Sequence, residues 1–336
     1  MTILVSDRVL LTADLHLSDN PRDSYRHDFM RGTLPQLLKN KKCDALYVLG
    51  DLTESKDYHG AWLVNTVVEH FYKLSKICKV VIIRGNHDYT LESHPFYAFL
   101  IRVPNITWVN KPTEIGNHIL LPHTHRWKPE WRGIDFQKHT AIFCHQTFEG
   151  FRGDSGHQLK GLPRHTFPTN IKVFSGDIHS PQKIDNITYV GAPYTVDFGD
   201  SYTPRVLQLY EKGRLITVSS IICEGPQKRL LEIDSDINLY HEGSPFKKGD
   251  ILKIRVRVST KDREHWLEFK QTIIKWADKN GYVLWQVQPV FDTAKRIKAW
   301  KQASPEADED TLARYGKTRK VPERTLKTGQ WLRQQV

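Results

Sequence analysis

Short apolar runs recur along the first two-thirds of the chain. They are rich in β-branched side chains, none exceeds seven residues, and they occupy residues 8–13, 44–50, 79–85, 140–144, 171–176 and 187–193. Runs of this length and composition predict buried β-strands. Residues 61–77 instead carry apolar side chains at helical spacing, which predicts an amphipathic helix between two strands. Strands that alternate with helices predict an α/β fold with a largely buried sheet.

The pattern changes near Cys223. Residues 249–290 read as a strand, a helix and a strand, which predicts a small α+β domain. The sequence therefore divides into a large domain at 1–222, a small domain at 223–297 and a tail at 298–336. The tail is basic, because residues 311–336 contain seven Lys and Arg residues and one glutamate.

Composition narrows the class of protein. The formal charge is +11, from 49 Lys and Arg against 38 Asp and Glu, which favours polyanionic partners. No apolar run approaches the ~18 residues of a membrane-spanning helix, and the sequence lacks a signal-peptide pattern. We therefore expect a cytoplasmic protein with no membrane partner. The four cysteines are far apart, which argues against a disulfide framework or a zinc ribbon.

Polar side chains follow five of the apolar runs. In chain order they are Asp14 and His16, Asp51, Asn86 with His87 and Asp88, His145, and Asp177 with His179. Because the carboxyl ends of strands in an open α/β sheet face one crevice, we expect these side chains to converge. Any single Asp-x-His or Gly-Asp pair is typical of an ordinary turn, so the prediction depends on all five occurring in order.

The converging side chains suit a pair of divalent ions. Carboxylate, amide and imidazole ligands bind Mn²⁺, Mg²⁺, Fe²⁺ or Zn²⁺. Two such ions can orient an attacking water and neutralise the charge that develops on a phosphoryl group. Asp51 is the natural bridge, because a carboxylate can offer one oxygen to each ion.

The series DLH, GDL, RGNHD, a later strand ending in His145, and GDIH resembles the calcineurin-like metallophosphoesterase superfamily. The resemblance covers residues 8 to about 200 and implies a β-sandwich core flanked by helices. Residues 176–200 are similar to the SbcD-type nuclease subunits of bacterial and phage double-strand-break repair complexes. This similarity implies a DNA nuclease that hydrolyses phosphodiester bonds with two divalent ions, Mn²⁺ first and Mg²⁺ as the alternative.

The resemblance also implies a role for each matching residue. The first ion would bind Asp14, His16, Asp51 and His179. The second ion would bind Asp51, Asn86, His145 and Asp177. His87 would contact the phosphate or protonate the leaving oxygen. Asp88 would orient His87 or serve as an ordinary turn aspartate.

Two positions depart from the family pattern. Asp177 stands where the family usually has histidine, and its anionic oxygen predicts a harder site that favours Mn²⁺ or Mg²⁺ over Zn²⁺. The alternative is an impaired second site. Glu54 replaces a histidine that many archaeal and eukaryotic relatives carry, which leaves the cleavage mode open. His123 and His125 either line the groove or belong to an ordinary loop.

The metal motifs do not select a substrate. The basic charge favours DNA, and the small domain resembles in placement the capping domain of the repair nucleases. The tail would bind an SbcC-type ATPase, serve as a basic DNA-binding arm or form a docked terminal helix. Homodimers are usual among the relatives. The alternatives are a phosphoesterase for nucleotides or phosphoproteins, and a non-catalytic DNA-binding subunit with an impaired metal site.

Overall fold

The computed structural model describes residues 7–153, 156–235, 246–259 and 261–291. The chain splits into two compact units. One comprises Met1–Leu231, Asn238–Ile254 and Gln271–Val287, and the other comprises Glu232–Ile237, Arg255–Lys270 and Gln288–Val336. The boundary at residues 222 and 223 stays a prediction, and the predicted basic tail lies outside the described residues. None of the described helices is both long and apolar enough to span a membrane.

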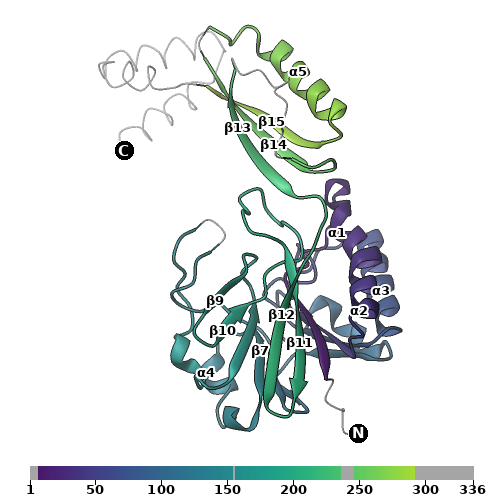
Figure 1. The fold of residues 1–336 in the computed structure, drawn as a ribbon, viewed down its shortest axis with the longest axis vertical. Helices are drawn as coiled ribbons and strands as arrows, with labels where there is room; N and C mark the ends of the chain where they lie inside the picture. The colour runs from purple at the N-terminus through teal and green to yellow at the C-terminus, as the bar shows by residue number, and fades with distance from the viewer. Residues whose placement is uncertain (1–6, 154–155, 236–245, 260, 292–336) are drawn as a thin grey trace, which may run out of the picture. The chain divides into compact units, whose positions relative to one another are not determined.

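Two six-stranded sheets form the core of the first unit (Figure 1). The first sheet has the order β12-β11-β1-β2-β3-β4, and β1 to β4 run parallel. Its strands are β1 (Arg8–Thr12), β2 (Ala45–Leu49), β3 (Lys79–Ile83), β4 (Ile106–Val109), β11 (Arg205–Lys212) and β12 (Leu215–Ile222). All residues of β2 are buried, as expected of a central parallel strand with both faces covered.

The second sheet has the order β5-β6-β7-β8-β10-β9. Its inner strands β6, β7, β8 and β10 run parallel. The strands are β5 (Thr113–Ile115), β6 (His118–Leu121), β7 (Ala141–His145), β8 (Lys172–Gly176), β9 (Gln182–Ile184) and β10 (Ile187–Tyr189). The predicted strand runs therefore all lie in these two sheets.

Side chains alternate between two apolar layers along each central strand. In β1, Val9 and Leu11 pack between the sheets, where Phe143 and Phe174 stack with ring centroids 5.5 Å apart. Leu10 faces the opposite way, toward the helices. The expectation of a β-sandwich core flanked by helices is confirmed.

Helices cover the outer faces of both sheets. The layer on the first sheet contains α1 (Ser24–Asp28), α2 (Leu34–Asn40), α3 (Ala61–Ser75) and the short turns η1 (Pro21–Asp23), η2 (Phe29–Thr33) and η3 (Phe96–Arg102). The second sheet is covered by α4 (Trp127–Glu130), η4 (Phe136–Lys138) and η5 (Arg164–Thr166) with their loops. Helix α3 buries Leu63, Val67, Phe71 and Leu74, which follow the helical period that predicted it.

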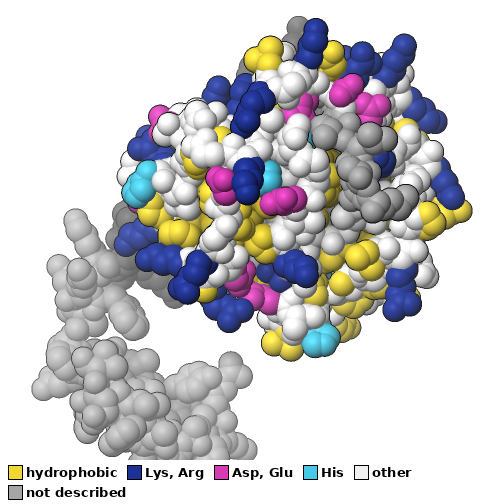
Figure 2. All heavy atoms as spheres, turned by 90° about the horizontal axis from the view of Figure 1, so that it is seen from below, with side chains coloured by type: hydrophobic (Ala, Val, Ile, Leu, Met, Phe, Trp, Pro, Cys, Tyr) yellow, Lys and Arg dark blue, Asp and Glu magenta, His cyan; other side chains and the backbone are white. Residues whose placement is uncertain are grey.

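A three-stranded sheet with the order β13-β14-β15 follows the core in the chain. Its elements are β13 (Lys228–Asp234), β14 (Ile251–Val258), α5 (Trp266–Lys279) and β15 (Val283–Phe291). Helix α5 buries Ile273, Trp276 and Ala277, which are three and four residues apart and share one face. The predicted strand, helix and strand are therefore present. Figure 2 shows Lys and Arg side chains spread over one face of the molecule among apolar and acidic ones.

A buried pair of imidazoles joins α1 to α3. His27 Nδ1 lies 3.2 Å from His70 Nε2, and His27 Nε2 lies 2.8 Å from the carbonyl oxygen of Ser18. Both rings are almost completely shielded from water. Burial lowers the pKa of His70 to about 4, helped by His27 and Arg31, and burial also lowers the pKa of His27.

We expect this pair to make the fold sensitive to acid. Between the ordinary pKa of 6.5 and about 4, the unfolded state binds a proton at His70 and the folded state does not. The stability from neutral His70 is therefore complete above pH 6.5 and falls by up to ~1.4 kcal/mol per pH unit on acidification. Urea unfolding of wild type and His70→Gln from pH 7 to 4.5 should show a shallower decline in the variant. The exposed His94→Gln is the control, and equal slopes in all three proteins would contradict the expectation.

Candidate metal centre

The predicted site residues come together at the carboxyl ends of strands from both sheets. Asp14 and His16 follow β1, Asp51 follows β2, and Asn86 to Asp88 follow β3, whereas His145 ends β7, and Asp177 and His179 follow β8. Three contacts join the residues that follow strands of the first sheet to those at the strand ends of the second sheet. The Asp177 amide donates to Asp14 Oδ1 at 3.0 Å, His145 Nε2 lies 2.7 Å from Asn86 Oδ1, and His179 Nε2 lies 3.2 Å from His16 Nε2.

The backbone takes an uncommon conformation at several of these positions. Asp14, His16, Asp51 and Asp177 have φ values of 54°, 41°, 57° and 88°. Positive φ is unfavourable for residues other than glycine, and such strain gathers at functional sites. Gly85 makes room for the Asp51 carboxylate, because a Cβ there would lie 2.2 Å from Asp51 Oδ1.

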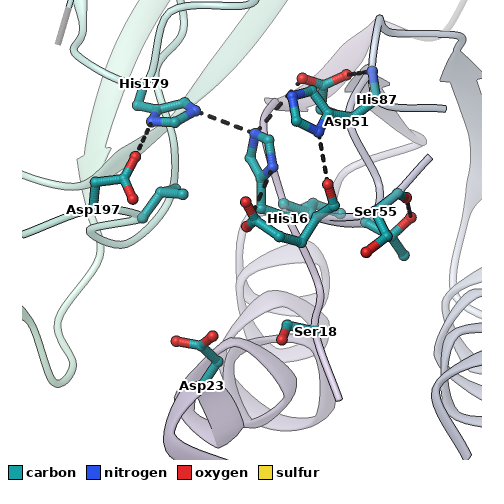
Figure 3. Close-up of polar contacts among 12 residues, drawn as sticks. His16, Ser18, Asp23, Asp51, Ser55, His87, His179 and Asp197 are labelled. Atoms are coloured by element: carbon teal, nitrogen blue, oxygen red, sulfur yellow. Dashed lines mark hydrogen bonds and ion pairs between the residues drawn. The ribbon is translucent and has the colours of Figure 1, made fainter. Parts of the chain in front are cut away.

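Asp51 lies at the middle of the cluster. Its Oδ2 is 3.6 Å from His16 Nε2, its Oδ1 is 3.5 Å from His145 Nε2, and the His87 amide donates to Oδ1 at 2.8 Å. Among the residues that the structure describes, two sets of side chains could each hold a metal ion, with ligand atoms within 4.8 Å of one another: His16–Asp51–His87 and Asp14–Asp51–His145. Asp51 belongs to both sets. Figure 3 shows His16 between His179 and Asp51.

The charges of the cluster leave a place for a cation. Asp14 is completely buried, and its Oδ2 has no hydrogen-bond partner among the described residues. Burial raises the pKa of Asp14 to about 7, against the opposing effect of His145 and His179. An unpaired buried carboxylate oxygen beside imidazoles and a second carboxylate fits a divalent metal ion.

The pKa values of Asp51 and His145 move in opposite directions. Burial disfavours the charge of each, but their mutual attraction outweighs it. The pKa of the Asp51 carboxyl is therefore held well below its usual range, and that of His145 is raised well above. In contrast, burial lowers the pKa of His16, which keeps this imidazole neutral and able to act as a ligand.

Asp177 directs its carboxylate toward the cluster. Its Oδ2 accepts a hydrogen bond from the Thr147 hydroxyl, and its Oδ1 lies 3.8 Å from His145 Nε2. A carboxylate at this position therefore keeps an oxygen near the atoms that could hold a metal, as the histidine usual in the family would keep a nitrogen.

The Asp88 carboxylate contacts backbone amides of two loops, which fits the turn aspartate of the two roles expected for it, and its orientation of His87 stays a prediction. The Asp88 carboxylate accepts hydrogen bonds from the backbone amides of Asp51 at 3.0 Å, Leu52 at 2.9 Å and Gly85 at 2.6 Å. It therefore holds the loop after β2 against the loop after β3. The His87 imidazole contacts the loop after β2, where its Nδ1 lies 2.7 Å from the carbonyl oxygen of Glu54.

Sequence reasoning missed Arg26. This buried guanidinium donates to the carbonyl oxygen of His16, to Glu54 Oε2 at 3.1 Å and to the carbonyl oxygen of Val196 at 3.0 Å. Arg26 lies in α1, outside any motif, and its partner Val196 is 170 residues away in the chain. His123 and His125, for which the sequence allows a groove or an ordinary loop, line a cavity that also includes Asn86.

A two-sheet core with a candidate site for divalent metal ions at its strand ends is typical of hydrolases of the metallophosphoesterase class. Residues 7–212 match the calcineurin-like phosphoesterase family, so the chain belongs to this family.

Two sequence relatives have curated names. Exonuclease subunit 1 of Enterobacteria phage T4 is 30% identical over 137 residues, which are 38% of this chain and 40% of that protein. Putative phosphoesterase 244L of Invertebrate iridescent virus 6 is 25% identical over 253 residues, which are 67% of this chain and 85% of that protein. The solved structure of Pseudomonas putida nuclease MPE is 21% identical to this chain, with a TM-score of 0.31. The match covers 64% of this chain and 72% of that protein.

Proposed function

We propose that this phosphoesterase is a DNA nuclease that hydrolyses phosphodiester bonds with two divalent ions, as the nuclease subunit of an SbcCD-like repair or recombination complex. The observation that carries the proposal is the presence of Asp51 in both sets of candidate ligands. The relative named as an exonuclease subunit supports the choice of nucleic acid as substrate. The net charge of +11 favours the same class of substrate.

The proposed ligands divide between two ions that share Asp51. Asp14, His16 and His179 would complete one set, and Asn86, His145 and Asp177 would complete the other. The ions, for which Mn²⁺ is the first choice and Mg²⁺ the second, would stabilise negative charge on the phosphoryl group and increase the acidity of water. The preference follows from the carboxylate oxygen that Asp177 contributes.

His87 is the proposed general acid. Its Nδ1 faces the Glu54 carbonyl oxygen, so Nε2 is the atom left to pass a proton to the leaving oxygen. Asp88 acts as a positioning residue, since its carboxylate binds the amides of Asp51 and Gly85. Burial and the nearby charge of Asp51 raise the pKa of Asp88 to about 6.

The remaining parts of the chain complete this proposal. Residues 1–222 form the phosphoesterase domain, residues 223–297 cap the DNA, and residues 298–336 bind an SbcC-type ATPase. The protein acts in the cytoplasm of a bacterium or of a phage-infected cell, with a homodimer as the expected assembly.

The purified protein with end-labelled linear duplex and circular single-stranded DNA tests the proposal. Cleavage that needs Mn²⁺ or Mg²⁺ and stops with EDTA is expected, and cleavage of the circle reports endonuclease action. Hydrolysis of a small phosphomonoester without DNA cleavage would favour a phosphatase for nucleotides or phosphoproteins. DNA binding without turnover under any divalent ion would favour a non-catalytic subunit.

We expect Asp177→His to move the metal preference toward Zn²⁺. An imidazole nitrogen is a softer ligand than a carboxylate oxygen, so the ratio of Mn²⁺-supported to Zn²⁺-supported kcat/KM should fall about tenfold, which is ~1.4 kcal/mol. Steady-state hydrolysis of a small phosphodiester with each ion measures this ratio. The exposed Asp278→His is the matched control. A similar gain with every ion would instead mean that Asp177 impairs the second site.

A further inference from the structure

A cavity of about 830 Å³ lies beside the candidate metal centre and shares Asn86 with it. Its other walls come from the loops that follow β2, β3, β4 and β6, and they include Lys56, Arg84, Tyr89 and Lys111. The volume is in the range of pockets that bind small molecules or parts of larger ligands.

Arg84 brings a buried positive charge to this cavity. The residue is 3% exposed, and its Nη1 donates to the carbonyl oxygen of Glu92 and to Asn110 Oδ1, each at 3.0 Å. Its Nη2 donates to the carbonyl oxygen of His123, and its guanidinium carbon lies 4.5 Å from the centroid of the Tyr89 ring. All these partners are neutral. Within the described part of the chain, no carboxylate lies at ion-pair distance from Arg84, and Nε has no hydrogen-bond partner.

The acidic side chains of the cavity are paired with Arg126, which also lines it. Glu92 and Glu130 lie 3.4 Å and 3.5 Å from the guanidinium of Arg126. Buried charges in proteins normally have a partner of opposite sign, because burial without one is costly. The charge of Arg84 therefore leaves a place for an anion from outside the chain.

Two further cations stand at the cavity. Lys56 and Lys111 are exposed, and neither forms an ion pair with another residue that the structure describes. Ammonium groups of this kind are suited to sequence-independent contacts with phosphates. Together with Arg84 they give the cavity three cations that no carboxylate neutralises at contact distance, next to Asn86 of the candidate metal centre.

We propose that this cavity holds the backbone phosphate of the nucleotide next to the scissile bond, with Arg84 beneath that phosphate and Lys56 and Lys111 at its sides. The proposal rests on the proposed nuclease function and adds to it a subsite that positions the strand. We place the neighbouring phosphate here because the cavity and the metal centre share Asn86. A phosphate in the cavity would therefore adjoin the phosphate under attack at the metal centre.

The test compares Lys56→Ala/Lys111→Ala with the charge-matched control Lys39→Ala/Lys212→Ala, which changes two exposed lysines outside the cavity. Fluorescence anisotropy with a labelled DNA duplex in EDTA, over a series of salt concentrations, measures affinity without turnover. The cavity variant should bind about tenfold more weakly, and its slope of log K against log salt should be smaller by about 1.8, for two lost phosphate contacts. With Mn²⁺, its KM for DNA should rise about tenfold with kcat and hydrolysis of a small diester unchanged.

Equal weakening in the cavity and control variants would overturn the subsite, because the lysines would then act only through net charge. In that case wild-type cleavage of DNA would still support the nuclease. Wild-type protein that hydrolyses the small diester but neither binds nor cleaves DNA would overturn the nuclease function and the subsite together. The behaviour of the wild type therefore separates the two failures.

Discussion

We expect Asp51→Asn to lower the metal-dependent kcat/KM for a small phosphodiester by about 10³-fold. An amide offers one oxygen and no charge, so it cannot serve both candidate metal positions that share this side chain. The loss of several kcal/mol of charge stabilisation corresponds to a factor of this size. Initial rates over a range of Mn²⁺ concentrations measure the effect, and calorimetry should show fewer bound ions than the two expected for wild type.

Asp57→Asn is the matched control, because Asp57 is exposed and near in sequence. It should retain wild-type rates and stoichiometry. A full complement of two ions in Asp51→Asn, with a rate within tenfold of wild type, would contradict the bridging role. Thermal unfolding of each variant distinguishes a lost ligand from a lost fold.

The second large effect is expected for His87→Ala and depends on the leaving group. Loss of a general acid should lower the rate of DNA cleavage by about 10²–10⁴-fold. A p-nitrophenyl diester has a leaving group that needs no proton, so its hydrolysis should fall far less. Parallel assays of the two substrates with wild type, His87→Ala and the exposed control His94→Ala measure this difference.

Metal binding by His87→Ala tests the alternative that His87 is a metal ligand. The imidazole of His87 belongs to one of the two candidate ligand sets, and its ring centroid lies 4.8 Å from that of His16. If His87→Ala loses one ion and both substrates slow equally, His87 is a ligand and not the general acid.

Local sequence patterns were enough to predict the layered core and the place of the site. The buried strands β1, β2, β3, β7 and β8 contain apolar runs, and the polar residues of the site lie at the end of each strand or within a few residues after it. The residues that follow neighbouring parallel strands lie at the same edge of the sheet. The order of the motifs therefore already implied that their side chains come together. The strands β11 and β12 were not predicted. Their pattern is weaker, because most residues of β12 are exposed.

The roles of Asp88 and Arg26 could not be obtained in this way. Asp88 follows His87 in the chain, yet its carboxylate binds amides of two different loops. Arg26 contacts the carbonyl oxygen of Val196, which is 170 residues away. Side-chain hydrogen bonds of this kind depend on where loops meet in space, and sequence spacing contains no measure of that distance.

The sequence by itself determined the α/β class and the set of residues that gather at the strand ends, because the period and the length of apolar runs are local properties. The resemblance to the metallophosphoesterases came from the ordered series of short motifs. Only the tertiary structure decided that Asp88 binds the amides of Asp51 and Gly85 and that Arg26 contacts the carbonyl oxygen of Val196. It alone placed the cationic cavity beside Asn86. These features arise where two sheets and their loops meet, and they depend on backbone angles and long-range contacts that the order of residues does not express.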